Sequence, residues 1–206
     1  VIRLVGKLVV LLLVVGVAWG GMSYVRSSND CPQPGRALPT DGMKGYVHCE
    51  YGPPSVLRLE TLPKPAPNDS QVLVRVHAVS LNPADWHGMR GTPMIARPSM
   101  GWRVPSEVAA GTDFAGVVES VGKQVTRLQP GDTVFGAGNG SFAEYVVARE
   151  SRVMKKPARI TMEQAAAIPV AAITALQGVR DQGQVRAGQR VLVNGASGGV
   201  GTFAVQ

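Results

Sequence analysis

The most chemically suggestive stretch of the 206-residue sequence is QRVLVNGASGGVGTFAVQ, residues 189–206. Ala196, Gly198 and Gly201 have the spacing of the dinucleotide fingerprint G-x-G-x-x-G, with alanine in the first place and Gly195 just before it. In that motif the first position makes a tight turn, the second lets backbone amides approach a pyrophosphate, and the third lets helix and strand pack closely. The spacing predicts a phosphate-binding turn.

A glycine turn with a purely structural role is the alternative, because the motif alone gives many false matches. No lysine follows the glycines, so the stretch is not a nucleoside-triphosphate loop. We expect RVLVNG, residues 190–195, to form the strand before the turn and GVGTFAVQ, residues 199–206, the helix after it. The candidate cofactor-binding residues of this stretch are Gly195, Ala196, Ser197, Gly198, Gly199, Val200 and Gly201.

The elements before the glycines indicate a β-rich domain over residues 44–160. Short strands are predicted within residues 44–51 and 55–62, around a turn with Gly and Pro. QVLVRVHAVSL, residues 71–81, alternates with a period of two and is the clearest strand of the chain. AAGTDFAGVVESVG, residues 109–122, is another strand whose glycines mark bulges or close approaches.

Turns separate these strands at steady intervals. Pro83 is expected to enforce a turn within NPADWHGMRG. Pro130 and Gly131 suit the central positions of a type II turn, so the strand at Thr133 reverses direction. SFAEYVVARE, residues 141–150, is expected to pair with that strand. Short strands joined by such turns favour a small barrel or sandwich.

The hydrophobic period changes at Thr161, where a second domain is expected to begin. Thr161 and Gln164 form a predicted capping box ahead of an alanine-rich helix, which Pro169 should divide into two pieces. The strand and glycine turn that follow restart an α/β pattern. The predicted fold class is therefore mixed α/β, with a β-rich domain over residues 44–160 and the start of a dinucleotide-binding domain over residues 161–206.

The composition is that of a globular protein. With 45% hydrophobic and 17% charged residues the chain is not a disordered one. The net charge is +7, but the basic residues are scattered, so no nucleic-acid partner is expected. Cys31 and Cys49 are expected to be free thiols, or one bridge if the chain is exported. His48, His77 and His87 lack metal-ligand spacing and are expected to be ordinary surface or strand residues.

The N-terminal segment, residues 1–26, is apolar enough to enter a membrane. After two basic residues it runs without a charge from Leu8 to Val25, close to the length that spans a bilayer as a helix. We expect a single transmembrane helix; a cleaved secretory signal and a misassigned start are the alternatives. Residues 27–43, rich in Ser, Pro, Asp and Gly, are expected to be a linker.

From residue 44 onward the sequence resembles the zinc-independent medium-chain dehydrogenases/reductases, specifically their quinone-oxidoreductase-like, NAD(P)-dependent members. The similar stretches, in family order, include VLVRVHAVSLNPADW, AGTDFAGVVESVG, QPGDTVFG, EQAAAIPVAAITALQ and GQRVLVNGASGGVG. The resemblance implies a GroES-like barrel domain followed by a Rossmann domain. It also implies an oxidoreductase that transfers hydride from NADP(H) or NAD(H), with NADPH favoured, to a quinone, enone or aldehyde-type carbonyl.

The resemblance places the candidate site residues as well. Asn82 stands where zinc-dependent relatives have a catalytic cysteine, and Thr112 and Asp113 stand where they have a His-Glu pair, so no metal is expected. Asn82, Asp85 and Trp86 are implied to lie at the cleft mouth beside the substrate and the nicotinamide. A simple turn with an asparagine cap and a buried tryptophan is the alternative.

Thr174 matches a family position that contacts the nicotinamide ring; the alternative is a helix residue that bonds back to a carbonyl. A Rossmann domain needs further βα units, so we expect the chain to be a C-terminally truncated fragment without the residue that separates NAD from NADP. A homodimer is one assembly that the resemblance allows for the full-length form. The alternative function is that of a non-catalytic, membrane-anchored binding module or truncated remnant.

Because nicotinamide cofactors are cytosolic, we expect a single-pass membrane protein whose catalytic part faces the cytoplasm. Export after signal cleavage is the alternative localisation.

Overall fold

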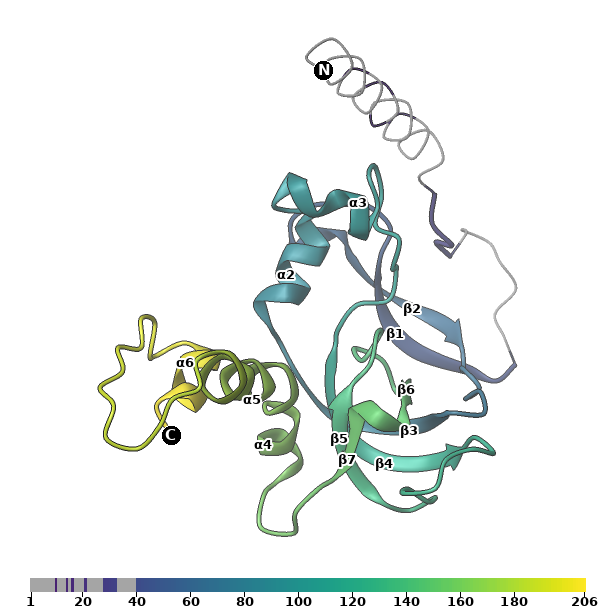
Figure 1. The fold of residues 1–206 in the computed structure, drawn as a ribbon. Coiled ribbons are helices and arrows are strands. Elements are labelled where there is room, and N and C mark those ends of the chain that lie inside the picture. Colours follow the sequence, from purple (N-terminus) through teal and green to yellow (C-terminus); the bar gives the residue numbers. More distant parts are fainter. Residues whose placement is uncertain (1–9, 11–13, 15, 17–20, 22–27, 33–39) are drawn as a thin grey trace.

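The computed structural model describes residues 10, 14, 16, 21, 28–32 and 40–206 (Figure 1). The predicted transmembrane segment, residues 1–26, lies almost entirely outside these residues, as does much of the predicted linker. No helix formed by the described residues is long and apolar enough to cross a bilayer. The described fold is that of the β-rich domain and of the helices that follow it.

An antiparallel ribbon of two strands opens the domain. β1 (Gly42–His48) pairs along its whole length with β2 (Leu57–Pro63), as the sequence predicts. Alternate residues of β1 point inward, so Met43 and Val47 are buried. An isolated bridge between Val47 and Ala109 joins the ribbon to the loop that leads into the larger sheet.

The larger sheet has five strands in the order β6-β3-β4-β5-β7, and every neighbouring pair is antiparallel. Its strands are β3 (Gln71–Ser80), β4 (Asp113–Val121), β5 (Thr133–Ala137), β6 (Tyr145–Arg149) and β7 (Val153–Lys155). The predicted pairing of residues 141–150 with the strand at Thr133 is wrong. β6 pairs with β3 instead, because both edges of β5 are occupied, by β4 and by β7.

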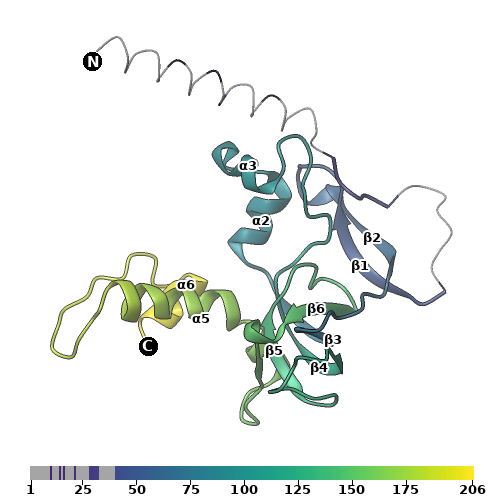
Figure 2. The same ribbon diagram turned by 45° about the vertical axis from the view of Figure 1, so that its right-hand side comes forward.

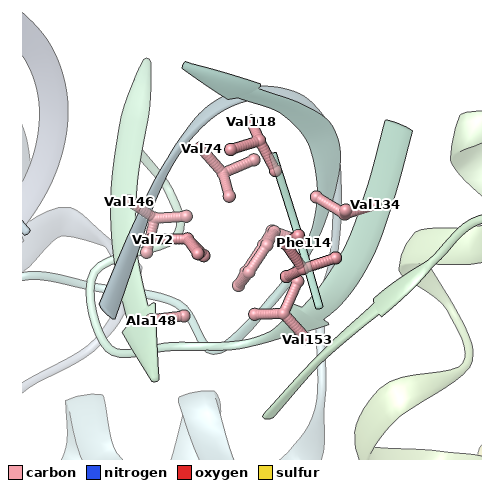
Figure 3. Close-up of a cluster of buried hydrophobic side chains, with 9 residues drawn as sticks. Val72, Val74, Phe114, Val118, Val134, Val146, Ala148 and Val153 are labelled. Atoms are coloured by element: carbon pink, nitrogen blue, oxygen red, sulfur yellow. The ribbon is translucent and has the colours of Figure 1, made fainter. Parts of the chain in front are cut away.

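The sheet curls around a core of small β-branched side chains with one phenylalanine at its centre (Figure 3). The alternation along β3 places Val72 and Val74 inside, each with 0% of its surface exposed. Phe114, from β4, is equally buried. The complete cluster is Val72, Val74, Phe114, Val118, Leu128, Val134, Val146, Ala148 and Val153. The curled sheet around this apolar interior is the barrel-like arrangement that the strand pattern favours, with β6 and β7 as its edge strands.

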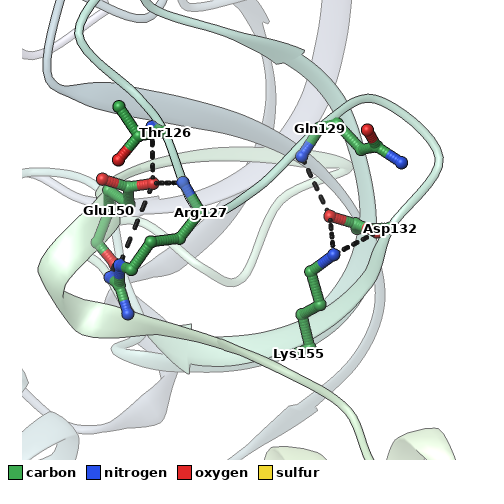
Figure 4. Close-up of polar contacts among 6 residues, drawn as sticks. All are labelled: Thr126, Arg127, Gln129, Asp132, Glu150 and Lys155. Carbon is green, nitrogen blue, oxygen red and sulfur yellow. Dashed lines mark hydrogen bonds and ion pairs between the residues drawn. The ribbon is translucent and has the colours of Figure 1, made fainter.

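The turn between β4 and β5 has the predicted conformation. The Asp132 N–H donates to the Gln129 carbonyl at 3.1 Å, and Gly131 has a φ of +90°, as a type II turn requires of its third residue. The Asp132 carboxylate accepts a hydrogen bond from the Gln129 N–H at 2.9 Å and pairs with the Lys155 ammonium at 2.9 Å (Figure 4). The hydrogen bond from Lys155 lowers the pKa of Asp132 below its ordinary value.

A second carboxylate closes the neighbouring loop. Glu150 accepts a hydrogen bond from the Thr126 N–H at 3.0 Å and another from the Arg127 N–H (Figure 4). The bond from Arg127 lowers the pKa of Glu150. Both surface carboxylates thus satisfy backbone N–H groups that would otherwise lack a protein acceptor.

Residues 83–90 form a helix, α2 (Pro83–Arg90), where the sequence predicts only a turn. Asn82 is extended, Pro83 occupies the first helical position, and Gly91 ends the helix at a φ of +62°. Proline at the start and glycine after the end are the usual boundary signals of a helix. A short second helix, α3 (Arg97–Met100), follows after a single turn of 3-10 helix at Met94–Ala96.

Two helices follow the barrel, and their break is where the sequence places it. α4 (Met162–Ala166) begins with the predicted capping box, in which the Thr161 hydroxyl accepts the Gln164 N–H at 3.2 Å. α5 (Pro169–Leu176) begins at the proline. α4 buries Ala165 and Ala166 against the outside of β4 and β5, and a turn of π-helix, Gln177–Gln182, extends α5.

The chain ends in α6 (Gly199–Ala204), the helix predicted after the glycine motif, which packs against α5 to one side of the barrel (Figure 2). The predicted strand over residues 190–195 is wrong, since this segment is a loop. Its Val191 and Leu192 side chains are 53% and 95% exposed. A strand forms by pairing, and within the described residues no neighbouring strand lies beside this segment to pair with it.

A disulfide joins Cys31 to Cys49, 18 positions apart, so the expectation of free thiols is wrong and the bridged alternative holds. The bridge fastens residues 28–32 to the end of β1. The Asn29 side chain adds a hydrogen bond to the Cys49 carbonyl at 2.9 Å. The Arg58 guanidinium donates to both sulfur atoms, at 2.8 Å to Cys49 and 3.2 Å to Cys31.

Candidate functional site

A cavity of about 610 Å³ lies between the β1–β2 ribbon, α2 and the loop that contains α3. Its walls are largely apolar and include Leu57, Met89 and Phe142. A pocket of this volume with apolar walls and a few polar groups suits a small organic molecule. The polar side chains on its wall are His48, Asn82, Asp85, Ser99, Ser106, Glu107, Thr112 and Asn139.

The first turn of α2 brings two of the predicted site residues to this wall. The Asp85 carboxylate accepts the Asn82 N–H at 2.7 Å and so closes the start of the helix. Its other oxygen accepts the Thr112 hydroxyl at 3.0 Å. The contact joins α2 to the residue before β4, so Asn82, Asp85 and Thr112 are fixed relative to one another.

Asp113 anchors the same cluster from inside. Its Oδ2 accepts the Asn82 side-chain amide at 3.1 Å and the Val170 N–H at 3.0 Å. Burial raises the pKa of the Asp113 carboxyl above its ordinary value, against the hydrogen bonds from Val170 and Asn82, which lower it. The positions that the resemblance pairs with zinc ligands therefore do lie together, but here they carry an amide, a hydroxyl and one buried carboxyl.

Trp86, the third predicted site residue, lines the cavity with 45% of its surface exposed. Its ring carries the Arg90 guanidinium at 4.7 Å and meets the His87 ring edge-on at 4.6 Å. The buried tryptophan of the alternative interpretation is thus wrong for this side chain. An exposed indole beside a cavity provides a flat apolar surface for a planar ligand.

The loop over the cavity is held by an arginine that faces inward. Arg97 donates to the carbonyls of Gly91 and Trp102, each at 2.9 Å, and stacks over the Tyr51 ring at 4.3 Å. The Tyr51 hydroxyl donates in turn to the Met100 carbonyl at 2.8 Å. These contacts fix α3 as one wall of the cavity.

His48 is the last residue of β1, so it is a strand residue as the sequence predicts, but its side chain faces the cavity and not the surface. It lines that cavity with 7% of its surface exposed, and its Nδ1 has no hydrogen-bond partner among the described residues. Burial lowers the pKa of His48, which favours the neutral imidazole. Alternation along β1 would place His48 on the face opposite Val47, so no sequence signal identifies it; both residues are buried because the alternation breaks at the end of the strand.

Thr174 lies on the exposed side of α5 and does not reach the cavity. Its hydroxyl donates to the Val170 carbonyl at 2.7 Å, the backbone contact that the sequence left open as the alternative. Contact of Thr174 with a nicotinamide ring stays a prediction.

The glycine motif has the compact turn that its spacing predicts. Gly195 has a φ of +75°, and the Gly198 N–H donates to its carbonyl at 3.0 Å. A side chain at Gly201 would place its Cβ only 2.1 Å from the Gly195 oxygen, so only glycine lets the loop lie this close to α6. Gly195, Ala196, Ser197, Gly198, Gly199 and Val200 are exposed, and Gly201 is buried.

The turn and the helix of the motif have the arrangement that dinucleotide binding needs, but the strand that normally precedes them is absent from the described residues. Residues 198–200, at the start of α6, are exposed, as phosphate binding at a helix start requires. The strand expected at 190–195 is a loop, so the motif holds half of its usual context. Neither this turn nor Thr174 contributes to the cavity wall formed by the described residues. The predicted substrate and cofactor residues are therefore two separate groups, linked through α5.

The donor set at Asn82, Thr112 and Asp113 does not suit zinc, which takes thiolate, imidazole and carboxylate ligands. Elsewhere in the described part of the chain, no three His, Cys, Asp or Glu side chains gather closely enough to hold a metal ion.

Comparison with known proteins agrees with this architecture. A family model described as "Alcohol dehydrogenase GroES-like domain" matches residues 68–158. The human quinone oxidoreductase is 38% identical over 160 residues, which are 76% of this chain and 46% of that protein. The chain thus spans about half the length of the curated relatives it matches.

Solved structures give the same result. The quinone oxidoreductase from Coxiella burnetii superposes with a TM-score of 0.70 at 34% identity, over 80% of this chain and 52% of that one. A mycobacterial protein solved in complex with NADPH superposes with a TM-score of 0.68 at 30% identity, over 79% of this chain and 47% of its own. The chain belongs to the quinone-oxidoreductase-like family of medium-chain dehydrogenases/reductases and contains the GroES-like domain of that family.

Proposed function

We propose that this protein is an NAD(P)H-dependent reductase that delivers hydride to a quinone, enone or aldehyde-type carbonyl held in the cavity. The observation that carries the proposal is the apolar cavity whose polar wall is the Asn82, Asp85 and Thr112 cluster. A conjugated carbonyl compound is largely apolar with one or two acceptor oxygens, which matches such a wall. The family relationship supports the same reaction class.

In the proposed mechanism the chain binds and orients the substrate and excludes water. Trp86 provides a flat surface, and Leu57, Met89 and Phe142 provide apolar walls. The Asn82 amide nitrogen carries two hydrogens, of which Asp113 accepts one. The second is available to a substrate oxygen on which negative charge develops. The orientation of this donor is already set before the substrate enters, because Asp113 and Asp85 hold Asn82 from two sides.

The cofactor, NADPH by preference or NADH, is proposed to bind at residues 195–201 with Thr174 nearby, and it supplies the hydride. The preference for NADPH is supported by the mycobacterial relative solved with that cofactor. Backbone N–H groups at the start of α6 would meet the pyrophosphate, and the small residues at 195, 196 and 198 leave room for it.

The experiment uses the full-length protein and measures NADPH oxidation by absorbance, with 1,4-benzoquinone as the acceptor. Asn82→Ala is expected to lower kcat/KM by roughly 100- to 1,000-fold, the range for loss of one preorganised donor. Glu119→Gln, a surface carboxylate on β4, is the matched control and should leave the rate unchanged. A full-length protein that gives no heat with NADPH in titration calorimetry would contradict the proposal.

For localisation we propose membrane attachment with the reductase on the cytoplasmic side. The supply of nicotinamide cofactor supports that side, whereas the Cys31–Cys49 disulfide favours the exported alternative, because such bridges persist in oxidising compartments. A compartment reporter fused to the C-terminus distinguishes the two. A periplasmic or lumenal signal would count against the nicotinamide-dependent activity as well.

A further inference from the structure

The buried carboxyl of Asp113 is the point at which three elements meet. Its Oδ2 accepts Asn82 Nδ2 at the start of α2, at 3.1 Å, and Ser80 Oγ at the end of β3, at 3.4 Å. The same oxygen accepts the Val170 N–H in the first turn of α5, at 3.0 Å. Asp113 is the first residue of β4 and has 0% of its surface exposed. Asp113 Oδ2 therefore contacts both the cavity wall, through Asn82, and α5, the helix against which α6 packs.

The contact with Val170 caps α5 from a distant strand. The N–H groups of the first helical turn have no acceptor within their own helix. Pro169 has no N–H, and the Val170 N–H is satisfied by Asp113, 57 positions away in sequence. An acceptor at this end of a helix also complements the helix dipole. Without Asp113, this N–H and the Asn82 amide would lose a shared acceptor.

The two oxygens of the carboxyl have different surroundings. All three donors converge on Oδ2, whereas Oδ1 is buried and has no hydrogen-bond partner among the described residues. An asparagine at position 113 can place its carbonyl oxygen where Oδ2 lies and its amide where Oδ1 lies. The three contacts would survive that change, and an alanine would remove all of them.

The first turn of α5 also contacts α6. Ala171 directly follows Val170 and lies against the start of α6, where a Cβ built on Gly199 would be 3.9 Å from the Ala171 Cβ. A shift of the first turn of α5 therefore moves the surface on which the glycine motif rests.

We propose that Asp113 is a positioning residue that holds the cavity segment at Asn82 and the first turn of α5 in one arrangement, so that a change on one side is felt on the other. The role deepens the proposed function, because it links the substrate wall to the helices assigned to the cofactor. The link itself is a property of the chain without any bound molecule.

The test is hydrogen exchange of the Val170 amide, followed by NMR in the full chain without cofactor. Asp113→Ala is expected to speed this exchange by about tenfold or more, the effect of losing one hydrogen bond to a charged group. Asp113→Asn should restore exchange close to that of the wild type. Asn82→Ala, which does not touch α5, should still speed Val170 exchange several-fold because Asp113 loses one of the donors that orient it.

Glu119→Gln, on the same strand, is the control and should leave the Val170 amide unchanged. The amides paired between β5 and β7, such as those around Gly136 and Val153, report whether the barrel stays folded. If Asp113→Ala does not fold, Asn82→Ala and Asp113→Asn still decide the matter. Unchanged Val170 exchange in Asn82→Ala, with faster exchange confined to α2, would overturn the proposal.

A titration with NADPH separates this role from the proposed function. Asn82→Ala should weaken NADPH binding several-fold, and Asp113→Asn should not. If the wild-type protein binds no NADPH, the reductase proposal fails, while the exchange experiment still decides whether Asp113 positions the two elements.

Discussion

Two runs of this chain are nearly identical in sequence and differ completely in structure. Val72, Leu73 and Val74 lie near the start of β3 and are almost fully buried. Val191, Leu192 and Val193 have the same residue types in the same order and lie in a loop, with Leu192 95% exposed. The first run has β4 on one side and β6 on the other. β-propensity thus produces a strand only where neighbours complete the backbone pairing and cover the side chains.

The largest expected change in stability is a test of how differently these two runs are surrounded. Phe114→Ala should lower the free energy of unfolding by about 3–5 kcal/mol, because it leaves a cavity in the barrel core. Leu192→Ala should change it by less than about 0.5 kcal/mol, since the side chain is already in solvent. Urea unfolding of both variants measures the difference. A cost of several kcal/mol at Leu192 would mean that the loop is packed in solution.

The disulfide extends the comparison to residues 28–32, which it fastens to the end of β1. The double variant Cys31→Ser and Cys49→Ser should lose about 3 kcal/mol of stability, the chain-entropy value for a loop of this length. Thermal unfolding with and without a reducing agent measures it. The wild type should match the double variant under reducing conditions, and a persistent gap between them would point to an effect of the serines themselves.

Glycine substitutions test whether the end of the chain is ordered despite its exposed loop. Gly201→Ala should cost about 1–3 kcal/mol of local stability, because its Cβ would meet the backbone of Gly195 at 2.1 Å. Gly199→Ala is the matched control: its Cβ would make only an ordinary 3.9 Å contact with Ala171, so no loss is expected. Amide exchange in α6 measures both. Equal behaviour of the two variants would contradict the close packing of the motif.

The smallest expected effect is the pH dependence of stability that arises from a buried aspartate, Asp113, compared with that from a surface aspartate, Asp132. The folded-state pKa of Asp113 is raised by burial, so the folded protein binds more protons than the unfolded chain just above pH 3.8, and stability falls as pH rises through that window. The pKa of Asp132 is lowered by Lys155, so its contribution is present above pH 3.8 and is lost as pH falls.

Thermal unfolding between about pH 3 and 7 measures the two contributions. The stability of Asp113→Asn relative to the wild type should rise with pH, and that of Asp132→Asn should fall with pH. The same slope in both variants would show that burial does not distinguish them.

Local signals predicted the strands β3, β4, β5 and β6, the Gln129–Asp132 turn and the break at Pro169, because these depend on alternation and on proline and glycine conformations. They gave no indication of β7. The partner of β6 was not predictable in the same way, since it depends on which edges of β5 are already occupied. The strand at 190–195 was mispredicted for a related reason, because pairing is a property of the surroundings and not of the segment.

The candidate site was predictable to a similar extent. The resemblance identified Asn82, Asp85 and Trp86, and all three lie on the cavity wall. It gave no role to His48, which is buried directly after Val47, where the alternation along β1 breaks. The convergence of three donors on Asp113 also lay beyond sequence reasoning, because the contributing residues are up to 57 positions apart.

The residues that line the cavity come from one continuous part of the sequence. Every described residue that lines it falls between His48 and Phe142, ahead of both α5 and the glycine motif. The residues that we propose for the substrate and those that we propose for the cofactor are thus encoded in consecutive, non-overlapping stretches of the gene. Under the proposed function, variation or recombination within the first stretch would change the substrate that is bound and leave the residues proposed for the cofactor intact.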